Sequence, residues 1–430
     1  MSNTILLEFR VRNYRSFQNE NSLSLVAAAD KSLEYTNTIE TGLQALPRAV
    51  RTAVIYGANA SGKSNLIRGL QSMRSIVKDS ASMKPNQPLD VQPFRLDQMS
   101  PAEPTMFEVT IMLAGIRYQY GFELSPERIQ SEWLLVYQKA KPQRWFERRS
   151  GKSEGKDIYE FSSHLIGSKR VWQDATRPNA LFLSTAVQLN SEILAPLYNW
   201  FAHEMVVFPD GGQLPFHFST SMLQKVDDSN QIAKLLQAAD MAVSSISAEP
   251  KKTFLHSVTL RPEQGFSDLT SEEKEVLHPR FRHIVGPVSV DFDFADESQG
   301  TQKMFSLAGP LLDILRKGRT VVIDELDRSL HPLLVRQIIE TFQDPELNPN
   351  GAQLIFTTHD TAQLDNSLLR RDQIWFAEKQ HGTQASELIS LSEFSPRKSE
   401  ALERNYLGGR YGGVPILARQ LIGQSALAEK

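Results

Sequence analysis

The 430-residue chain contains no cysteine, and this absence excludes several classes of chemistry. Without thiols, the chain has no disulfide, no cysteine-ligated zinc or iron–sulfur cluster and no thiol nucleophile. The sequence also lacks an uninterrupted apolar run of about 18 residues, the length that spans a membrane, and Glu8 introduces charge where a secretion signal would be apolar. We therefore expect a soluble, cytoplasmic protein with no membrane partner.

Net charge is also nearly absent, because 47 basic side chains face 50 acidic ones, a formal balance of −3. The whole chain is therefore not attracted to nucleic acid or anionic lipid, and such binding would require a local basic patch. With 40% apolar residues, the composition is that of a globular protein. The length allows two or three domains, or one composite domain.

The first 140 residues read as short strands interrupted by one helix. Alternating or apolar runs at 5–11 and 22–26 predict two strands, and residues 107–124 predict an antiparallel hairpin. A further strand at 51–56 ends at Gly57, and apolar residues then recur at helical spacing from Leu66 to Val77. The order strand, glycine loop, helix is the important feature of this part.

The last third of the head region alternates helices and strands. Helical patterns at 303–316 and 333–342 enclose a buried strand at 320–323, and another strand follows at 353–358. This alternation predicts a parallel sheet covered on both faces. Between these regions, 141–157 reads as a hydrophilic loop and 179–283 as mostly helical, without the heptads of a long coiled coil.

The phosphate-binding loop pattern occurs in full between the strand at 51–56 and the helix after it. Its glycines let backbone N–H groups surround phosphates at a helix N-terminus, Lys63 reaches the terminal phosphates, and Ser64 can bind Mg²⁺. The partial copy at 150–153 lacks the first glycine and the flanking strand, so we interpret it as a loop. The predicted ATP-binding residues are Gly57, Ala58, Asn59, Ala60, Ser61, Gly62, Lys63 and Ser64.

Acidic and histidine residues follow the next two apolar strands. Asp324 and Glu325 come directly after the strand at 320–323, where parallel sheets bind ligands. We expect Asp324 to hold Mg²⁺ and Glu325 to orient and deprotonate the attacking water. His359 directly follows the strand at 353–358, and we expect its side chain to lie at the γ-phosphate.

Two further positions complete the predicted nucleotide site. Ser298 and Gly300 lie just before the helix that leads to Asp324, in a segment that resembles the signature of ABC-type ATPases. The resemblance implies that they bind the γ-phosphate of a nucleotide held by a second protomer; an ordinary helix N-cap is the alternative interpretation. Gln92 is the preferred residue for linking metal and γ-phosphate, and Gln87 the weaker candidate.

Together these motifs resemble the ABC-type ATPase heads of RecF, SMC and Rad-type proteins. More narrowly, they resemble the AAA15/AAA21 group that contains the OLD-like and RloA-like bacterial ATPases, with long matches at 9–17, 324–332, 370–376 and 406–412. His331 stands where transporters place an aspartate. The resemblance implies an α/β fold: an ABC-type P-loop NTPase head at 1–140 and 286–395 with a mixed or parallel sheet and an antiparallel β lobe, a mostly helical insertion at 141–285, and a C-terminal helical tail at 396–430.

The resemblance also implies a function. Such ATPases use ATP and Mg²⁺, assemble head to tail as dimers or multiples of dimers, and act in bacterial anti-phage defence of the abortive-infection type. There they regulate an effector encoded nearby, such as a nuclease, and this chain is too short after Phe376 for its own nuclease domain. The alternative is a DNA-binding ATPase of RecF or Rad type, with Arg144, Arg148, Arg149, Lys152 and Lys156 as its phosphate-contacting patch. A catalytically silent scaffold is disfavoured, because all the catalytic residues are present.

Overall fold

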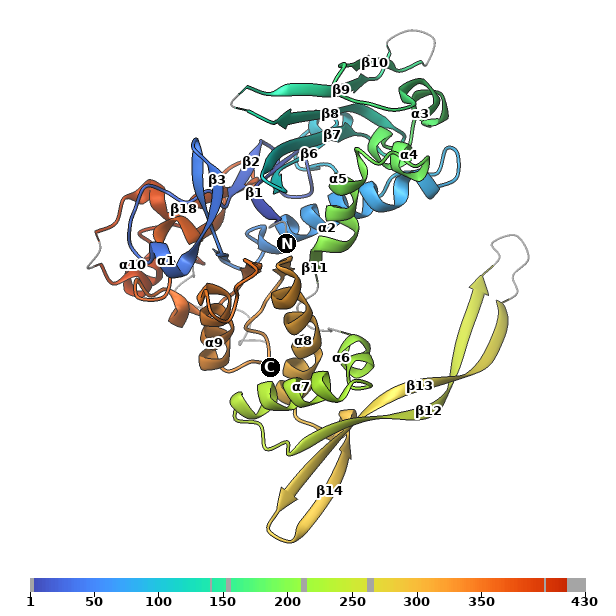
Figure 1. Ribbon diagram of the computed structural model, residues 1–430. Helices are drawn as coiled ribbons and strands as arrows, with labels where there is room; N and C mark the ends of the chain where they lie inside the picture. Colours follow the sequence, from blue (N-terminus) through green and yellow to red (C-terminus); the bar gives the residue numbers. More distant parts are fainter. Residues whose placement is uncertain are drawn as a thin grey trace, which may run out of the picture. The chain divides into compact units, whose positions relative to one another are not determined.

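The computed structural model describes residues 4–139, 141–151, 156–209, 215–260, 267–397 and 400–415, and the side chains of 253–260 and 267–273 are outside this description. The chain forms two compact units. The first contains residues 1–211, 315–328 and 335–430, and the second contains 212–314 and 329–334. Figure 1 shows the elements of each unit in chain order.

A seven-stranded antiparallel sheet forms one part of the first unit. Its order is β10-β9-β8-β7-β6-β1-β2, and β6 and β7 are the hairpin that the sequence predicts. The strands are β1 (Ile5–Arg12), β2 (Asn21–Ser24), β6 (Thr105–Leu113), β7 (Ile116–Leu124), β8 (Ile129–Tyr137), β9 (Gln143–Arg149) and β10 (Ile158–Phe161).

The second sheet of this unit has the order β11-β15-β16-β5-β17-β18. All of its neighbouring strands run parallel except β17 and β18. Its strands are β5 (Thr52–Tyr56), β11 (Met205–Phe208), β15 (Thr320–Ile323), β16 (Gln353–Thr357), β17 (Ile374–Lys379) and β18 (Ser386–Ser390), while β3 (Thr38–Leu43) and β4 (Leu46–Val50) form a separate hairpin. The order brings β15, β16 and β5 side by side, so the loops after them share one edge of the sheet.

Helices cover these sheets with apolar faces. In α2 (Lys63–Asp79) the residues Leu66, Leu70, Met73 and Val77 are buried in the same core as the inward-facing side chains of β6–β9, and Figure 1 shows α2 and α4 along that sheet. The remaining helices of the unit are α1 (Glu34–Asn37), α3 (Lys169–Ala175), α4 (Phe182–Gln188), α5 (Ala195–Asn199), α10 (Leu402–Leu407) and most of α9 (Pro332–Gln343). Short helical turns are η1 (Ser80–Ser82), η2 (Ser100–Ala102), η3 (Trp200–Glu204), η5 (Thr361–Gln363), η6 (Arg371–Gln373) and η7 (Leu391–Phe394).

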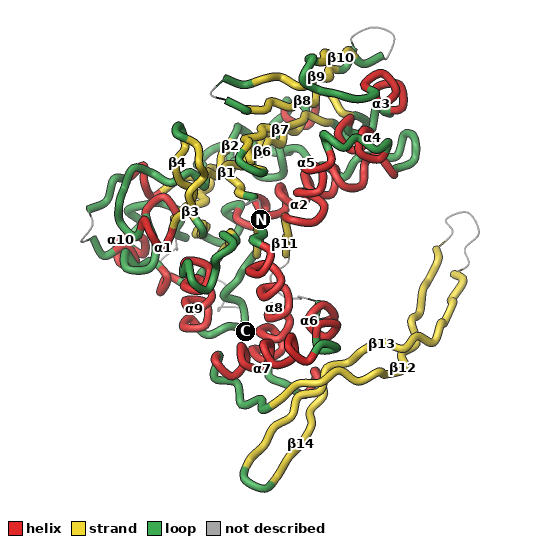
Figure 2. Tube along the Cα trace, viewed as in Figure 1, coloured by secondary structure: helices red, strands yellow, loops and turns green. Residues whose placement is uncertain are grey.

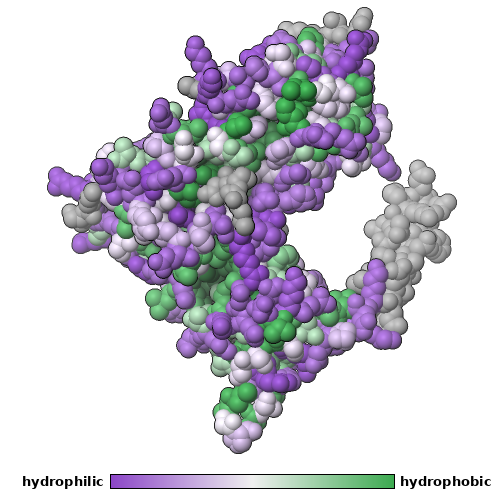
Figure 3. Space-filling model, viewed as in Figure 1, coloured by the Kyte–Doolittle hydropathy of each residue, from purple (hydrophilic) through white to green (hydrophobic). Residues whose placement is uncertain are grey.

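The second unit combines three helices with a long hairpin, as Figure 2 shows by colour. Its elements are α6 (His217–Met222), α7 (Val226–Ala238), β12 (Ser245–Leu260), β13 (Ser267–Val285), β14 (Val288–Asp293), η4 (Phe294–Asp296) and α8 (Gln299–Lys317) up to Ile314. Ser219 of α6 donates a hydrogen bond to the Phe305 carbonyl and accepts one from Gly309 N–H, which fixes α6 to α8. At the β13–β14 turn, where Figure 3 shows green and white residues, Val285 and Val288 are exposed.

The expected helical insertion at 141–285 is only partly present. Helices α3 to α7 lie within it, but the prediction is wrong for β9, β10, β11, β12 and β13. Over 274–293 many side chains of the hairpin face water, and 274–287 lack the apolar alternation that marks a half-buried strand, although Val288, Val290 and Phe292 alternate with polar residues. The compact unit also begins near 212 rather than 141, because β9 and β10 pair with the antiparallel sheet. In the expected tail, α10 is helical, and residues 416–430 lie outside the described residues.

Candidate nucleotide-binding site

The phosphate-binding loop connects the buried strand β5 to α2. Two glycines permit its path: Gly57 has φ +153° and Gly62 has φ +115°, and a Cβ atom on either would overlap a neighbour, the Ala377 carbonyl or the Ser386 side chain. The Ser386 hydroxyl also donates a hydrogen bond to the Ser61 carbonyl at 2.6 Å. The loop is therefore fixed from the side of β17 and β18, before any ligand is considered.

Lys63 is the buried cation of this loop. Its Nζ donates hydrogen bonds to the carbonyls of Gly57 at 2.7 Å and Ala58 at 3.1 Å. Burial lowers the pKa of Lys63, and the charges of Asp324 and Glu325 oppose part of this shift. Because those carboxylates influence Lys63 electrostatically, the acidic strand end and the phosphate-binding loop face one another.

Asp324 and Glu325 are held by the next strand of the sheet. The carboxylate of Asp324 is 4% exposed and accepts a hydrogen bond from the Thr357 hydroxyl. That hydroxyl in turn accepts a hydrogen bond from the backbone N–H of Glu325 at 2.7 Å. Glu325 has φ +49°, a left-handed conformation that is uncommon for a residue other than glycine and is typical of constrained functional positions.

His359 follows β16 and is exposed at the same edge. Its backbone N–H donates a hydrogen bond to Asp327 at 3.2 Å, and the other carboxylate oxygen of Asp327 is buried without a hydrogen-bond partner. The sequence analysis gave no role to Asp327 or Thr357. Asp327 lies two residues after Glu325 and Thr357 two residues before His359, but this spacing alone does not mark a role.

The donor set fits Mg²⁺ bound together with phosphates. Among the described residues, no group of three or more His, Asp or Glu side chains is arranged to hold a metal alone. Mg²⁺ does not require one, because it keeps several waters and uses one or two carboxylates plus substrate phosphates. The buried Asp324 carboxylate and the Ser64 hydroxyl, at the first turn of α2, are ligands of the expected kind.

A pocket of about 530 Å³ opens beside the start of the phosphate-binding loop. Gly57, Ala58 and Asn59 form one part of its lining and His359 another. The C-terminal residues that the sequence analysis left without a role form a further wall, with Tyr406, Leu407, Gly413, Val414 and Pro415. The chain after α10 therefore contributes to this site.

The remaining predicted residues are Ser298, Gly300 and Gln92. Ser298 and Gly300 belong to the second unit, and Ser298 Oγ accepts the Thr301 N–H at 3.1 Å, the contact of an N-cap on α8. Gln92 is exposed, and its backbone carbonyl accepts the Arg15 N–H at 2.8 Å. Gln87 instead accepts the Lys84 N–H with its side chain. The roles of Ser298, Gly300 and Gln92 stay predictions.

The structure removes Arg148 from the expected basic patch. Arg148 is 1% exposed, with its guanidinium bonded to Asp157 and to the carbonyl of Ala180. Arg144 and Arg149 both form ion pairs with Glu147 on the same strand. Arg144, Arg149 and Lys156 are exposed, and Lys152 lies outside the described residues.

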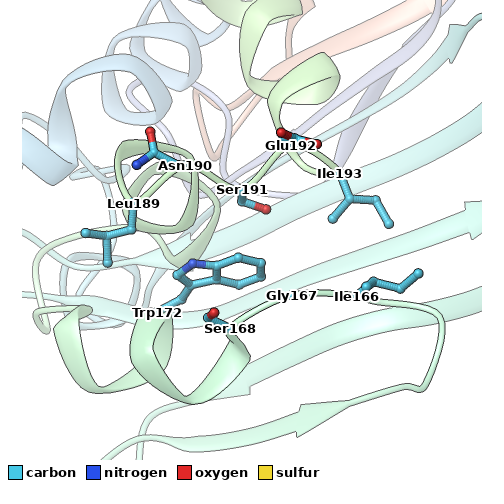
Figure 4. A pocket seen from close by; sticks show the side chains of 9 residues that line it. All are labelled: Ile166, Gly167, Ser168, Trp172, Leu189, Asn190, Ser191, Glu192 and Ile193. Atoms are coloured by element: carbon cyan, nitrogen blue, oxygen red, sulfur yellow. The ribbon is translucent and has the colours of Figure 1, made fainter.

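A separate pocket of about 510 Å³ lies within the first unit between the loop before α3 and the loop after α4 (Figure 4). The Trp172 indole forms its floor, with Ile166 and Ile193 beside it. Its lining contains no lysine, arginine or histidine, so it lacks the cation that a phosphate would need.

Comparison with known families agrees with the interpretation of the motifs. The family model described as "AAA domain, putative AbiEii toxin, Type IV TA system" matches residues 53–365. The chain belongs to this family. Among curated proteins, none matches the sequence. The resemblance predicted from the motifs is confirmed by this membership, and the α/β fold class is confirmed by the two sheets and their covering helices.

Two solved structures are similar to this AAA-domain chain. The SMC head domain from Thermotoga maritima is 13% identical, covers 90% of this chain and 98% of its own, and gives a TM-score of 0.37. The Smc head domain with an extended coiled coil from Pyrococcus furiosus, bound to the C-terminal domain of ScpA, is 12% identical, covers 91% and 98%, and gives 0.40. Neither likeness is close enough to carry an argument about activity or partners. No helix in the described part of the chain is long and apolar enough to cross a membrane.

Proposed function

We propose that this AAA-domain protein binds ATP with Mg²⁺ and hydrolyses it to ADP and phosphate. The observation that carries the proposal is the order of three adjacent strands. The phosphate-binding loop follows β5, two carboxylates follow β15 and His359 follows β16, all at one edge of the sheet. A nucleotide held by the loop would have its terminal phosphate beside the carboxylates and the histidine.

Each residue then has one task. Loop amides and Lys63 would hold the phosphates, while Ser64 and Asp324 would hold the metal, which would supply positive charge against the phosphates. Glu325 orients the attacking water and accepts its proton, and His359 hydrogen-bonds the γ-phosphate. The Thr357 hydroxyl contacts both acidic residues: it orients the Asp324 carboxylate and holds the backbone N–H of Glu325.

The proposed active state is a head-to-tail assembly of two or more copies. Ser298 and Gly300, at the N-terminus of α8, would bind the γ-phosphate held by the second copy. A dimer built in this way contains two composite sites, and ATP is the ligand that joins them. Assemblies of more than two copies would repeat the same head-to-tail contact.

We further propose that this ATP-controlled assembly regulates a separate effector in anti-phage defence. The family description, which names a toxin and a toxin–antitoxin system, supports a partnership of this kind. The alternative of DNA repair loses its main support, because Arg148 is buried and Arg144 is paired.

The testing experiment measures the mass of wild type and Glu325→Gln by light scattering after size exclusion, with and without Mg-ATP. Glu325→Gln keeps the phosphate contacts but removes the base, so ATP should accumulate in the closed assembly and shift its mass to a dimer or a multiple. Lys63→Ala is the control that should not respond. Equal ATPase rates in wild type and Glu325→Gln would show the proposed mechanism to be wrong.

The regulatory part needs a second measurement. The protein encoded beside this chain is co-expressed with wild type and with Glu325→Gln, and the complex is purified at low and high salt. We expect a complex whose stability changes with ATP and which needs no DNA. Salt-dependent duplex binding that strengthens with ATP, in the absence of such a complex, would support the DNA-repair alternative.

A further inference from the structure

The C-terminal segment, residues 402–415, lies directly on the start of the phosphate-binding loop. A Cβ atom on Gly413 would lie 3.5 Å from the Gly57 Cα, so the two backbones are in contact. Beside it, a Cβ atom on Gly412 would overlap the Glu378 carboxylate. Both glycines have positive φ, +69° for Gly412 and +67° for Gly413, so this path suits glycine at both positions.

The hydroxyl of Tyr406 joins this segment to the loop. It donates a hydrogen bond to the Gly413 carbonyl at 3.1 Å, and Gly413 in turn lies against the Gly57 backbone. Burial raises the pKa of Tyr406, the Gly57 amide opposes this shift, and the side chain is only 6% exposed. The hydroxyl is therefore protonated and fully engaged in a buried position.

The ring of Tyr406 also packs against neighbouring aromatic side chains. It stacks on Phe376 of β17 with centroids 5.2 Å apart and packs against Tyr56 of β5 at 5.7 Å. Tyr411 stacks on the same Phe376 at 5.6 Å. Since Tyr56 is the last residue of β5, the ring is anchored on the strand that delivers the loop.

Gly57 connects this anchor to the cation of the site. Its Cα lies against Gly413, which the Tyr406 hydroxyl holds, and its carbonyl accepts a hydrogen bond from the Nζ of Lys63 at 2.7 Å. A displacement of Gly57 would therefore move the acceptor that orients Lys63. Such a change of position, with every charged group still present, is the kind that reduces turnover more than binding.

We propose that Tyr406 is a positioning residue for ATP hydrolysis, which fixes Gly57 and through it Lys63. This inference rests on the proposed ATPase function. The segment 402–415 is then a structural part of the nucleotide site, with Tyr406, Leu407 and Gly413 lining the pocket that His359 also faces.

The test compares Tyr406→Phe with Tyr411→Phe in the full chain. The two tyrosines share the segment, the buried position and the Phe376 stack, but the Tyr411 hydroxyl bonds Glu400 and Asn405 instead of the loop. We expect Tyr406→Phe to lower kcat about tenfold with the Kd for ATP changed less than about threefold. Tyr411→Phe should keep the wild-type kcat, counted per nucleotide-binding site, even if its melting temperature falls.

The outcomes separate this inference from the function on which it rests. If wild type does not hydrolyse ATP, the proposed function fails. If wild type hydrolyses ATP and Tyr406→Phe has the kcat of Tyr411→Phe, the positioning role is wrong and the ATPase function stands. Should Tyr406→Phe not fold, amide exchange of 402–415 in wild type decides: slower exchange with Mg-ATP supports the contact, and unchanged exchange contradicts it.

Discussion

The hydroxyl of Thr357 lies 2.6 Å from the carboxylate of Asp324 and donates a hydrogen bond to it. The same oxygen accepts the backbone N–H of Glu325. Thr357 is the last residue of β16 and Asp324 follows β15, so two neighbouring strands fix the acidic residues through one side chain. The distance between the metal-binding acid and the proposed base therefore depends on a residue that contacts neither nucleotide nor water in our mechanism.

Replacing Thr357 with valine removes this hydroxyl and keeps a similar shape. The buried Asp324 oxygen and the Glu325 N–H lose their partner, which we expect to cost about 1–3 kcal/mol of folding free energy. We also expect kcat to fall about tenfold, because the Asp324 carboxylate and the Glu325 backbone are no longer held by one hydroxyl. ATPase assays and denaturant unfolding measure both effects.

Thr320→Val is the matched control for Thr357→Val. Thr320 is also a buried threonine in this sheet, but it begins β15, whereas Asp324 follows the other end of that strand. It should lose stability without a comparable fall in kcat. A Thr357→Val enzyme with the same kcat as Thr320→Val would remove the hydroxyl from the mechanism.

The contrast between predicted and observed features has physical causes. The loop at 57–64 and the ends of β15 and β16 are visible in the sequence, because glycine patterns and apolar runs are local signals. Thr357 and Tyr406 act through contacts with Asp324 and Gly57, which are distant in the chain, so no local pattern marks them. The β12–β13 hairpin lacks a clear strand period, and its sixteen paired positions are fixed by backbone pairing.

Alkaline pH should weaken ATP binding through Lys63. Burial lowers the pKa of Lys63, and Asp324, Glu325 and Asp327 counteract only part of that effect. In the free protein Lys63 thus loses its charge at lower pH than an ordinary lysine, and bound phosphate favours the charged form. Between the lowered and the ordinary pKa, ATP binding must take up a proton, so affinity falls as pH rises.

The pH dependence of folding stability has the opposite sign. In that window the native state binds fewer protons than the unfolded state, so the contribution of Lys63 to stability increases with pH. Calorimetric titrations with ATP near about pH 9, repeated in buffers with different heats of ionisation, measure the proton uptake on ATP binding. Lys63→Arg stays charged and should show none of this uptake. Equal uptake in both proteins would assign the proton to another group.

Ser298→Arg should block assembly and leave the single-chain nucleotide site intact. Ser298 caps α8 in the second unit, and a long cationic side chain there would occupy the space proposed for the phosphate of a second copy. We expect unchanged ATP binding, loss of the ATP-driven mass increase in a Glu325→Gln background, and loss of turnover. Ser289→Arg, at an exposed position on β14 of the same unit, is the control. Assembly that persists in Ser298→Arg would leave Ser298 as an N-cap only.

Arg148→Met should destabilise the protein strongly and leave any DNA affinity unchanged. The fully buried Glu132 accepts the N–H groups of Phe182 and Leu183, and Arg148 lies 3.7 Å from it while also pairing with Asp157. Burial raises the pKa of Glu132, and the Arg148 charge opposes that shift. Without Arg148 both carboxylates lose their buried partner, which we expect to cost about 3–5 kcal/mol in denaturant unfolding.

A double variant and a surface variant separate charge from packing in this cluster. Adding Glu132→Gln to Arg148→Met removes one unpaired charge, so it should recover part of the lost stability. Arg144→Met, with a half-exposed side chain on the same strand, should change stability by less than about 0.5 kcal/mol. If Arg148→Met instead lowered duplex affinity with little loss of stability, Arg148 would face phosphate in solution, and the DNA-binding alternative would regain its basic patch.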